Sequence, residues 1–354
     1  MPALEVPEKG VAMVQSRALN PTKAVVIAGM LMLLLCGCDS KAATVTAGGD
    51  SPASPAQDPA AGPSGPTQSR FLVEIGKQKF PEAKPREEAL PIRFDFSGTK
   101  VYAFDYSQQV EVLSQMNGRT KDAGGMKQKM DAKGVLLLKS KGDKTGTLVL
   151  KDMQMRMGVA AKNADPERTR EMKSPPMAIP KVTEDGGMEG GALNAQPLLK
   201  LLFPMPPKPL KPGESTLVPV SIPFNAMGSP LTVQGTSKVT HSGYVLIDGK
   251  VCARLDIEID VSQLEVPKEL DGKYSCSTKG GSVYYYDLES AEFVSGETAV
   301  LMKMSIDSKR PGFNTPDQEK PSHLPKTVQM AMDSDTLIRL VRNPAAAKAE
   351  AEGK

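Results

Sequence analysis

Methionine is the residue type with the most potential for chemistry in this sequence. The 354 residues include 19 methionines but only two histidines, His241 and His323. Met153, Met155 and Met157 alternate with polar residues, as on one face of a strand. Thioether sulfur is a soft ligand that selects Cu(I), so these three are candidate ligands for a soft metal. Because methionine also fills apolar cores and no histidine lies near this run, we favour core packing or the lining of a hydrophobic pocket.

Three acidic residues form a second set of candidates. Asp256, Glu258 and Asp260 are two residues apart, which places their carboxylates on one strand face at intervals of roughly 7 Å. That spacing would suit acid–base chemistry or a hard cation. Arg254 shares the face, however, and alternating charges are typical of a solvent-exposed sheet. No Gly-x-Ser-x-Gly, His-Glu-x-x-His or phosphate-binding glycine loop is present, so we expect neither catalytic activity nor a cofactor.

Charge excludes one class of partner. Lys plus Arg is 44 and Asp plus Glu is 41, so the formal net charge is only +3. A nucleic-acid binder normally shows a concentrated basic excess. We therefore expect no nucleic-acid partner, and the length suits one large domain or two small ones.

The elements that would position these residues are mainly strands. Apolar residues recur at every second position in 102–112, and further strands are expected at 282–288, 291–295, 298–306 and 326–341. Within 244–261, Asp248-Gly249 lies between an apolar run at 244–247 and an alternating run at 251–261, the signature of a tight hairpin turn. One short helix is expected at 192–203, ended by prolines. The predicted fold is mostly β, with antiparallel sheets forming a curved sheet, a half-barrel or a sandwich.

Two stretches of the predicted fold resemble each other, each with a glycine, a strand, a turn and a longer alternating strand. They suggest two similar β-units, at 71–158 and 192–342. The charged, aperiodic stretch 159–191 is predicted to be a flexible insert between them. We expect residues 343–354 to be a disordered tail.

The N-terminal region predicts export. Lys23 precedes an apolar run, Ala24 to Leu35, which is too short to span a bilayer and has the order of a secretory signal. Leu35-Cys36-Gly37-Cys38 resembles the lipobox of bacterial lipoproteins. The resemblance implies a signal peptide at 1–37 and lipidation of Cys38. Residues 38–70 are rich in Ala, Gly, Ser and Pro, and are predicted to be a disordered linker.

A second resemblance concerns the body of the chain. Pro209-Leu-Lys-Pro-Gly-Glu-Ser-Thr216 precedes a long hairpin, and the stretch from Leu210 to Ile259 is similar to uncharacterised β-rich bacterial lipoproteins. That family implies a fold rather than an activity. Lipidation of Cys38 would leave Cys252 and Cys276 as a pair in an oxidising compartment, which predicts a structural disulfide.

These observations lead to one functional expectation and one alternative. We expect a non-catalytic lipoprotein, held at the cell membrane by its lipid with its body in the periplasm or another extracytoplasmic space. It would act as a binding or envelope-interaction module for an apolar ligand or a protein partner. The alternative is copper handling through the methionine-rich strands.

Overall fold

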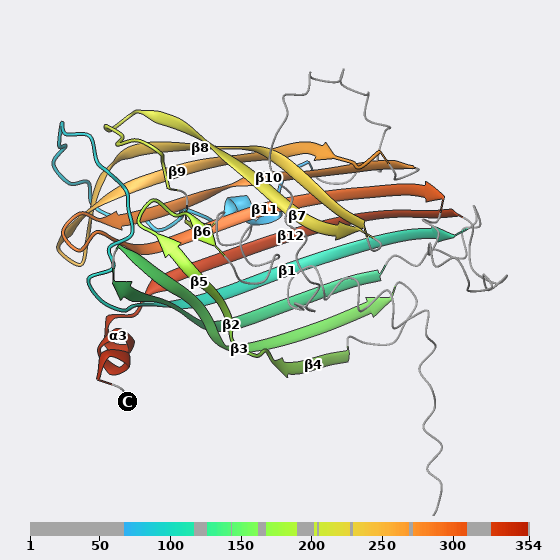
Figure 1. Cartoon of the computed structure of the whole chain (residues 1–354), viewed down its shortest axis with the longest axis horizontal. Coiled ribbons are helices and arrows are strands. Elements are labelled where there is room, and N and C mark those ends of the chain that lie inside the picture. Colours follow the sequence, from blue (N-terminus) through green and yellow to red (C-terminus); the bar gives the residue numbers. More distant parts are fainter. Residues whose placement is uncertain are drawn as a thin grey trace, which may run out of the picture. The chain divides into compact units, whose positions relative to one another are not determined.

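A computed structural model of the chain describes residues 67–116, 126–142, 144–161, 168–189, 202–203, 205–226, 229–268, 272–309 and 327–352. The predicted signal peptide, Cys38 and the linker as far as residue 66 lie outside these ranges. The described residues all belong to one compact unit. Within it, twelve strands form a single curved sheet that does not close on itself (Figure 1).

Every strand pairing in this sheet is antiparallel, which confirms the predicted fold class. The order across the sheet is β6-β5-β3-β2-β1-β12-β11-β10-β9-β8-β7, and β4 also pairs with β3. The strands are β1 (Lys100–Met116), β2 (Met126–Gly142), β3 (Thr145–Ala161), β4 (Arg168–Lys173), β5 (Met177–Thr183), β6 (Met188–Glu189), β7 (Ser215–Ala226), β8 (Ser229–Ile247), β9 (Lys250–Glu265), β10 (Lys273–Asp287), β11 (Glu292–Lys309) and β12 (Thr327–Arg342).

The β8–β9 hairpin shows how the sequence produces these strands. Asp248 and Gly249 have φ values of 51° and 77°, the left-handed geometry of a tight two-residue turn, as predicted. Along β9 the buried residues alternate with more exposed ones, so that Leu255, Ile257 and Ile259 share one face. The period of two therefore sets both the strand and the side that is buried.

The predicted domain boundaries do not divide the sheet. β12, from the second predicted unit, pairs with β1 of the first along 15 residue positions, from Tyr102↔Arg342 to Met116↔Val328. The flexible insert predicted at 159–191 is wrong for its described part, because β4, β5 and β6 lie there and extend the sheet beyond β3. Backbone pairing with a neighbouring edge stabilises these short strands even though their sequences lack alternation.

The helical predictions also need correction. The described helix is α3 (Pro344–Ala351), in the segment predicted to be a disordered tail. Asn343 caps it by accepting a hydrogen bond from the Ala346 N–H, and proline starts it. The helix predicted at 192–203 lies outside the described residues, apart from Leu202 and Phe203.

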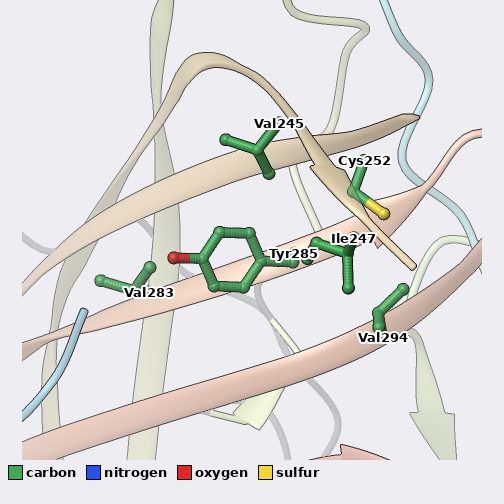
Figure 2. Packing of buried hydrophobic residues seen from close by; sticks show 6 residues of the cluster. All are labelled: Val245, Ile247, Cys252, Val283, Tyr285 and Val294. Atoms are coloured by element: carbon green, nitrogen blue, oxygen red, sulfur yellow. The ribbon is translucent and has the colours of Figure 1, made fainter. Parts of the chain in front are cut away.

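The sheet has two faces with different covers. We call the face that carries Tyr102, Tyr106 and Tyr284 the inner face, and the opposite one the outer face. A short 3-10 helix, η1 (Arg70–Val73), and the residues after it cover the outer face. Figure 2 shows the outer cluster beneath this cover, made of Val245, Ile247, Cys252, Val283, Tyr285 and Val294, with Ile75 and Phe80 packed against it.

The two edges of the sheet approach each other on the inner side. A Cβ added to Gly186, in the turn between β5 and β6, would lie 2.6 Å from Cγ of Met205, in the segment that leads to β7. The chain before β1 bridges the same gap. The Phe94 N–H donates to the Glu184 carbonyl, and Leu90 pairs with Leu210. The inner face is therefore the concave one.

Candidate ligand-binding face

The inner face of the five central strands, β9, β10, β11, β12 and β1, is long, buried and almost free of charge. Strand register places the even-numbered residues of β1, β10 and β12 there, together with the odd-numbered residues of β9 and the even-numbered residues of β11 from Gly296 onward. A shift in the β10–β11 register puts Phe293 opposite Tyr286 and so on the same face. Among the described side chains, no Asp, Glu, Lys or Arg occupies this face on β1 between Phe104 and Val112. The same holds for the positions of the neighbouring strands that are in register with this stretch. The face divides into three zones.

The first zone is an aromatic cluster at one end. Phe293 is its centre, with ring centroids 5.4–5.5 Å from those of Phe203, Tyr284 and Tyr286. Phe94, from the segment that bridges the two sheet edges, lies 5.2 Å from Phe203 in an edge-to-face arrangement. Such contacts rigidify packing beyond simple burial. The aromatic cluster consists of Phe94, Tyr102, Phe203, Tyr284, Tyr286 and Phe293, and it fills this end of the concave face.

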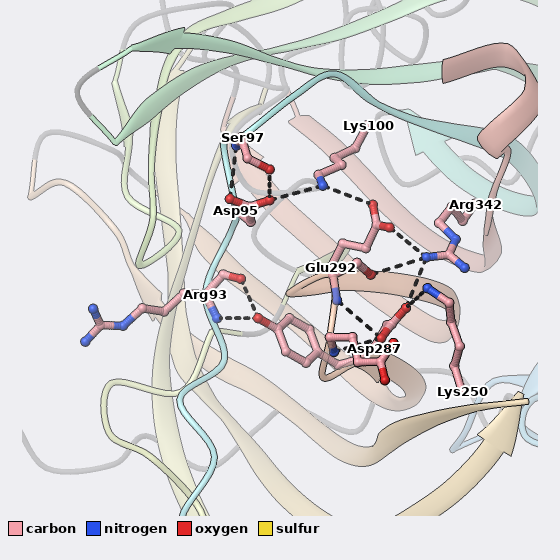
Figure 3. Close-up of polar contacts among 11 residues, drawn as sticks. Arg93, Asp95, Ser97, Lys100, Lys250, Asp287, Glu292 and Arg342 are labelled. Atoms are coloured by element: carbon pink, nitrogen blue, oxygen red, sulfur yellow. Dashed lines mark hydrogen bonds and ion pairs between the residues drawn. The ribbon is translucent and has the colours of Figure 1, made fainter. Parts of the chain in front are cut away.

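An ionic cluster lies beside the aromatic cluster (Figure 3). Asp287 is fully buried and accepts hydrogen bonds from Lys250 (3.1 Å) and Arg342 (3.3 Å). Arg342 also donates to Glu292 at 2.6 Å, and Lys100 lies 3.7 Å from Glu292. Burial alone would raise the pKa of Asp287, but hydrogen bonds from Ser290, Lys250 and the Glu289 N–H lower it to about 2. The cluster joins the β10–β11 turn to the end of β12, and its carboxylates are paired rather than free for chemistry.

The second zone is a belt of hydroxyl groups across β10, β11, β12 and β1. Two of its members make hydrogen bonds with neighbouring residues of the same face: Gln108 Nε2 donates to Ser334 Oγ at 2.7 Å, and Tyr284 Oη lies 3.0 Å from Thr298 Oγ1. We call this set the hydroxyl belt. It comprises Tyr106, Thr278, Ser282, Thr298, Ser334 and Thr336, all of them buried.

Several polar atoms of the inner face have no hydrogen-bond partner. Four buried side-chain atoms of the described residues lack one: Tyr102 Oη, Tyr106 Oη, Ser282 Oγ and His241 Nε2. All four residues lie on the inner face, because the register pairs His241 with Leu255. Buried polar groups are normally satisfied. An unsatisfied one costs about 1–3 kcal/mol, so their concentration on one face needs an explanation.

The third zone, at the far end of the inner face, is rich in sulfur. Strand register places Cys276, Met304, Met332 and Val112 side by side in one row across four strands, and all four are buried. We call these four residues the sulfur row. It offers soft, polarisable surface that adapts to irregular apolar shapes.

The predicted metal candidates lie on β3, on the inner side of the sheet. Met153 and Met155 are buried, whereas Met157 is half-buried and its Sδ lies 3.0 Å from Gln128 Nε2. Register adds two methionines that the sequence could not place there: Met130 lies opposite Met157, and Met172 lies opposite Met155. The structure therefore brings the run together with further thioethers.

The predicted disulfide is absent, because Cys252 and Cys276 are both free thiols. Cys252 lies opposite Asp287, at one end of β10, while Cys276 lies near the other end of that 15-residue strand. At about 3.4 Å per residue this separates them by roughly 35 Å, whereas a disulfide needs Cα atoms within about 7 Å. Burial raises the pKa of Cys252 to about 11 and that of Cys276 to about 12.

The predicted acidic trio lies on the outer face, and each acid has a different cationic neighbour. Asp256 accepts from Arg254 at 3.0 Å, Glu258 lies 3.9 Å from Lys238, and Asp260 lies 3.4 Å from Lys279. No group of three or more His, Cys, Asp or Glu in the described residues is arranged to hold a metal ion. The interpretation of the trio as a surface pattern agrees with this arrangement.

One hollow lies away from the inner face. It measures about 670 Å³, lies over β7, β8 and β9, and is lined by Ser221, Gln234, Asp260 and Gln263 among others. Its polar groups come from neighbouring strand positions and do not converge on a point. The inner face is therefore the stronger candidate site. His323, the second histidine of the sequence, lies outside the described residues.

Comparisons with known proteins give little more. No helix in the described ranges has the length and apolar character needed to cross a bilayer. No family model matches the sequence, and no curated protein does either. A lipovitellin structure concerned with lipid–protein interactions is similar over 70% of this chain, with 10% identity and a TM-score of 0.35, and the match spans 25% of the lipovitellin chain. The translocator domain of the autotransporter NalP from Neisseria meningitidis is similar over 69% of this chain and 89% of its own, with 10% identity and a TM-score of 0.19.

Proposed function

We propose that this protein is a non-catalytic binding module whose concave inner face takes up an apolar ligand. One observation carries the proposal: the inner face of five adjacent strands is lined by buried apolar and hydroxyl side chains without a charged group at those levels, among the residues described.

The expected N-terminal lipid would hold this module at a membrane. A diacylated or triacylated Cys38 holds a protein stably, whereas a single chain gives only marginal attachment. The linker to residue 70 would let the body work away from the lipid headgroups, with a reach of roughly 30 Å. Labelled palmitate should enter the wild-type chain and not the Cys38→Ser variant. Equal labelling of both would overturn the membrane part of the proposal and leave the binding face untested by that result.

The binding part has its own test. The full chain is extracted from membranes in a mild non-ionic detergent, and molecules that remain bound are identified by mass spectrometry after denaturation. A Met304→Gln variant adds a polar group to the sulfur row, and Lys303→Gln, its neighbour on the outer face, is the matched control. We expect an apolar molecule with wild type and the control, and several-fold less with Met304→Gln. If none of the three carries one, the proposal fails.

Copper handling is a second candidate, favoured by the methionine neighbours that the register supplies. Side chains directly opposite on neighbouring strands have Cβ atoms about 4.5–5.5 Å apart, so Met155 and Met172 lie close enough to share a soft metal ion. Competition with a chromophoric Cu(I) chelator tests this. Replacement of Met153, Met155 and Met157 by leucine should abolish submicromolar binding, while Met188→Leu should not. Wild-type chain without measurable Cu(I) affinity would remove this candidate.

A further inference from the structure

The outer face carries two neighbouring hollows over the strands from β7 to β11. The larger one, of about 670 Å³, is lined by residues of β7, β8 and β9. The smaller one, of about 200 Å³, is lined by residues of β10 and β11 together with Thr67. Asp260 lines the larger hollow and Lys279 the smaller one, and these two side chains form an ion pair across β9 and β10 at 3.4 Å. The hollows therefore lie on either side of this ion pair.

An irregularity in the strand pairing shapes the larger hollow. Gln234 lies opposite Gln263, whereas the next residue of β8, Gly235, lies opposite Val261. Ser262 is therefore the extra residue of a β-bulge in β9. A Cβ atom on Gly235 would overlap the backbone of β9, so the close approach of the two strands at the bulge requires glycine. As a result Ser262 and Gln263 both line the hollow, although they are adjacent in the sequence.

The polar groups of the two linings can both donate and accept hydrogen bonds. The side chains of Ser221, Ser262 and Gln263 are exposed and make no hydrogen bond within the described part of the chain. Thr67 and Ser277 add two hydroxyls in the smaller hollow. Hydroxyls and amides act as donors and as acceptors. A matching ligand also donates and accepts at several points, as the hydroxyl groups of a sugar do.

Ion pairs leave this surface without a free cation among the described lining residues. Lys279 pairs with Asp260, and Lys303, in the smaller hollow, lies 3.7 Å from Asp333. A phosphate or carboxylate of a ligand would therefore meet a carboxylate beside each lysine. Like charges placed side by side are unfavourable. A neutral ligand avoids this repulsion.

The linings offer little to an apolar ligand or a peptide. Val220 and Leu301 belong to the linings but are buried, so Pro219 is the exposed apolar side chain among the described lining residues. A peptide usually binds in an apolar groove or adds a strand to a free sheet edge. The hollows lie instead over strands that are already paired with each other. Hydrogen bonds to a hydroxyl-rich ligand are the interaction that this surface can provide.

The polar groups are spread over a long stretch of the sheet. From Ser221 on β7 to Lys303 on β11 there are four strand spacings, which is roughly 19 Å. These groups do not converge on one point, so they suit a chain of sugar units better than a single unit.

We propose that the outer face over β7 to β11 binds a neutral, unbranched oligosaccharide, whose hydroxyl groups exchange hydrogen bonds with side chains of both hollows. Ser221, Ser262 and Gln263 contribute in the larger hollow, and Ser277 in the smaller one. This site is separate from the inner face and does not depend on the apolar ligand proposed there. No aromatic ring is among the described lining residues, so we expect modest affinity without ring stacking.

Saturation-transfer NMR titrations of the full chain test this proposal. The detergent is a polyoxyethylene type, because sugar-based detergents would compete. Maltohexaose, cellohexaose and chitohexaose are the neutral probes, and hexagalacturonate is the charged probe. We expect at least one neutral hexamer to bind with a Kd of about 1 mM or tighter. It should bind at least about tenfold more tightly than its own disaccharide, which is too short to reach both hollows, and than hexagalacturonate.

Variants locate the binding. The Ser262→Ala/Gln263→Ala double variant removes two polar groups of the larger hollow and should weaken hexamer binding at least about tenfold. Gln154→Ala, at an exposed glutamine on β3, is the matched control and should bind like wild type. Because the replaced side chains are exposed, both variants should keep the Tm of wild type.

Three results would overturn the proposal. The first is that no neutral hexamer binds wild type with a Kd of about 1 mM or tighter. The second is that hexagalacturonate binds more tightly than every neutral chain, which contradicts the neutral class. The third is equal binding by wild type and the double variant, which contradicts the site. All three leave the Met304→Gln test of the inner face unaffected, so a failure here is distinguishable from a failure of the proposed function.

Discussion

The two faces of the same strands are completed in different ways. On the outer face the chain supplies its own cover, and the polar groups of that cover are bound. Asp335 accepts from Ser69 and Arg70, and Glu297 accepts from the Gly76 N–H. All four buried side-chain atoms of the described residues that lack a hydrogen-bond partner lie on the inner face. The difference shows that both faces bury apolar surface, whereas the unpartnered buried polar atoms of the described side chains gather on the inner face.

The largest effect should follow from removal of the aromatic centre of the inner face. Phe293 contacts four other rings, and its replacement by alanine opens a cavity that these rigid side chains cannot fill. We expect Phe293→Ala to lower the free energy of unfolding by about 3–5 kcal/mol. Denaturant unfolding measures it.

Phe71→Ala is the matched change on the outer face. Phe71 packs on Ala299 and Leu337 from the four-residue helix η1, which can shift to close a gap. It should cost less than Phe293→Ala. A larger loss for Phe71 would mean that the cover, and not the aromatic cluster, holds the two sheet edges together.

Each face carries one free thiol, so the reactivities of the two thiols provide a second comparison of the faces. Cys252 belongs to the outer cluster, and Cys276 to the sulfur row of the inner face. Since burial raises the pKa of both, to about 11 and about 12, little thiolate exists at pH 8. We expect native chain to react with iodoacetamide at least about 100-fold more slowly at both positions than denatured chain, a difference worth about 2.7 kcal/mol.

Peptide mass spectrometry assigns the alkylation to each cysteine, and Cys276 should be the slower of the two. If the two peptides are recovered as one disulfide-linked species without prior oxidation, the separation of these residues across the sheet is wrong. Fast native alkylation of Cys276 alone would mean that the sulfur row is open to solvent.

Asp287 gives the acid dependence of the ionic cluster. Its pKa is about 2 in the fold and 3.8 as a free side chain. Above pH 4 the carboxylate is ionised in both folded and unfolded chains, and its stabilisation is complete. As pH falls from 4 to 2 the unfolded chain takes up the proton first, so the stability contributed by Asp287 declines by about 2 kcal/mol.

An Asp287→Asn variant removes that acid dependence and lowers stability at pH 7, because Lys250 and Arg342 lose a charged partner. Unfolding at pH 7, 4 and 2 measures both effects. Asp256→Asn, at a half-exposed ion pair of the outer face, is the control and should behave like wild type within about 0.5 kcal/mol. Parallel acid loss in wild type and Asp287→Asn would contradict the assignment.

Local pattern and tertiary pairing explain how much of this could be predicted from the sequence. Alternation in 102–112 and the Asp248-Gly249 turn are local signals, so the antiparallel β fold and its strongest hairpin were predictable. β4, β5 and β6 were not, because their pairing with β3 depends on an edge that the rest of the fold creates. The helix at 344–351 was missed because an alanine-rich tail looks the same whether it is ordered or not.

The candidate site was predictable only in character. The methionine run on β3 was found, but the row that joins Cys276, Met304 and Met332 comes from three strands and depends on register alone. The same holds for the hydroxyl belt, since single serines and threonines carry no signal in a sequence. The disulfide prediction failed for a related reason: an even number of cysteines says nothing about their distance along neighbouring strands.

The smallest effect should come from His241. Of the four residues with an unpartnered polar atom on the inner face, it is the one whose side chain titrates near neutral pH. Its Nδ1 donates to the Leu210 carbonyl at 3.2 Å, which leaves Nε2 as an unpartnered acceptor in a buried place. Burial lowers the pKa of this imidazole. Above pH 6.5 the ring is neutral in folded and unfolded chains, so pH has no effect through this group. Below it the unfolded chain binds a proton that the folded chain refuses, and stability falls by at most 1.4 kcal/mol per pH unit.

An asparagine side chain can donate the hydrogen bond that His241 Nδ1 makes, but it has no atom that corresponds to Nε2 and no group that titrates in this pH range. His241→Asn should therefore lose the decline in unfolding free energy between pH 7 and 5, while His323→Asn, which changes the other histidine of the sequence, keeps it. Bound ligand gives a further comparison. If a ligand on the inner face supplies a donor to Nε2, the acid decline of the wild-type chain becomes steeper on loading, because the ligand further favours the neutral ring. A decline that is identical in His241→Asn and wild type would mean that this inner atom is already satisfied, and the contrast between the two faces would then rest on the tyrosine and serine hydroxyls alone.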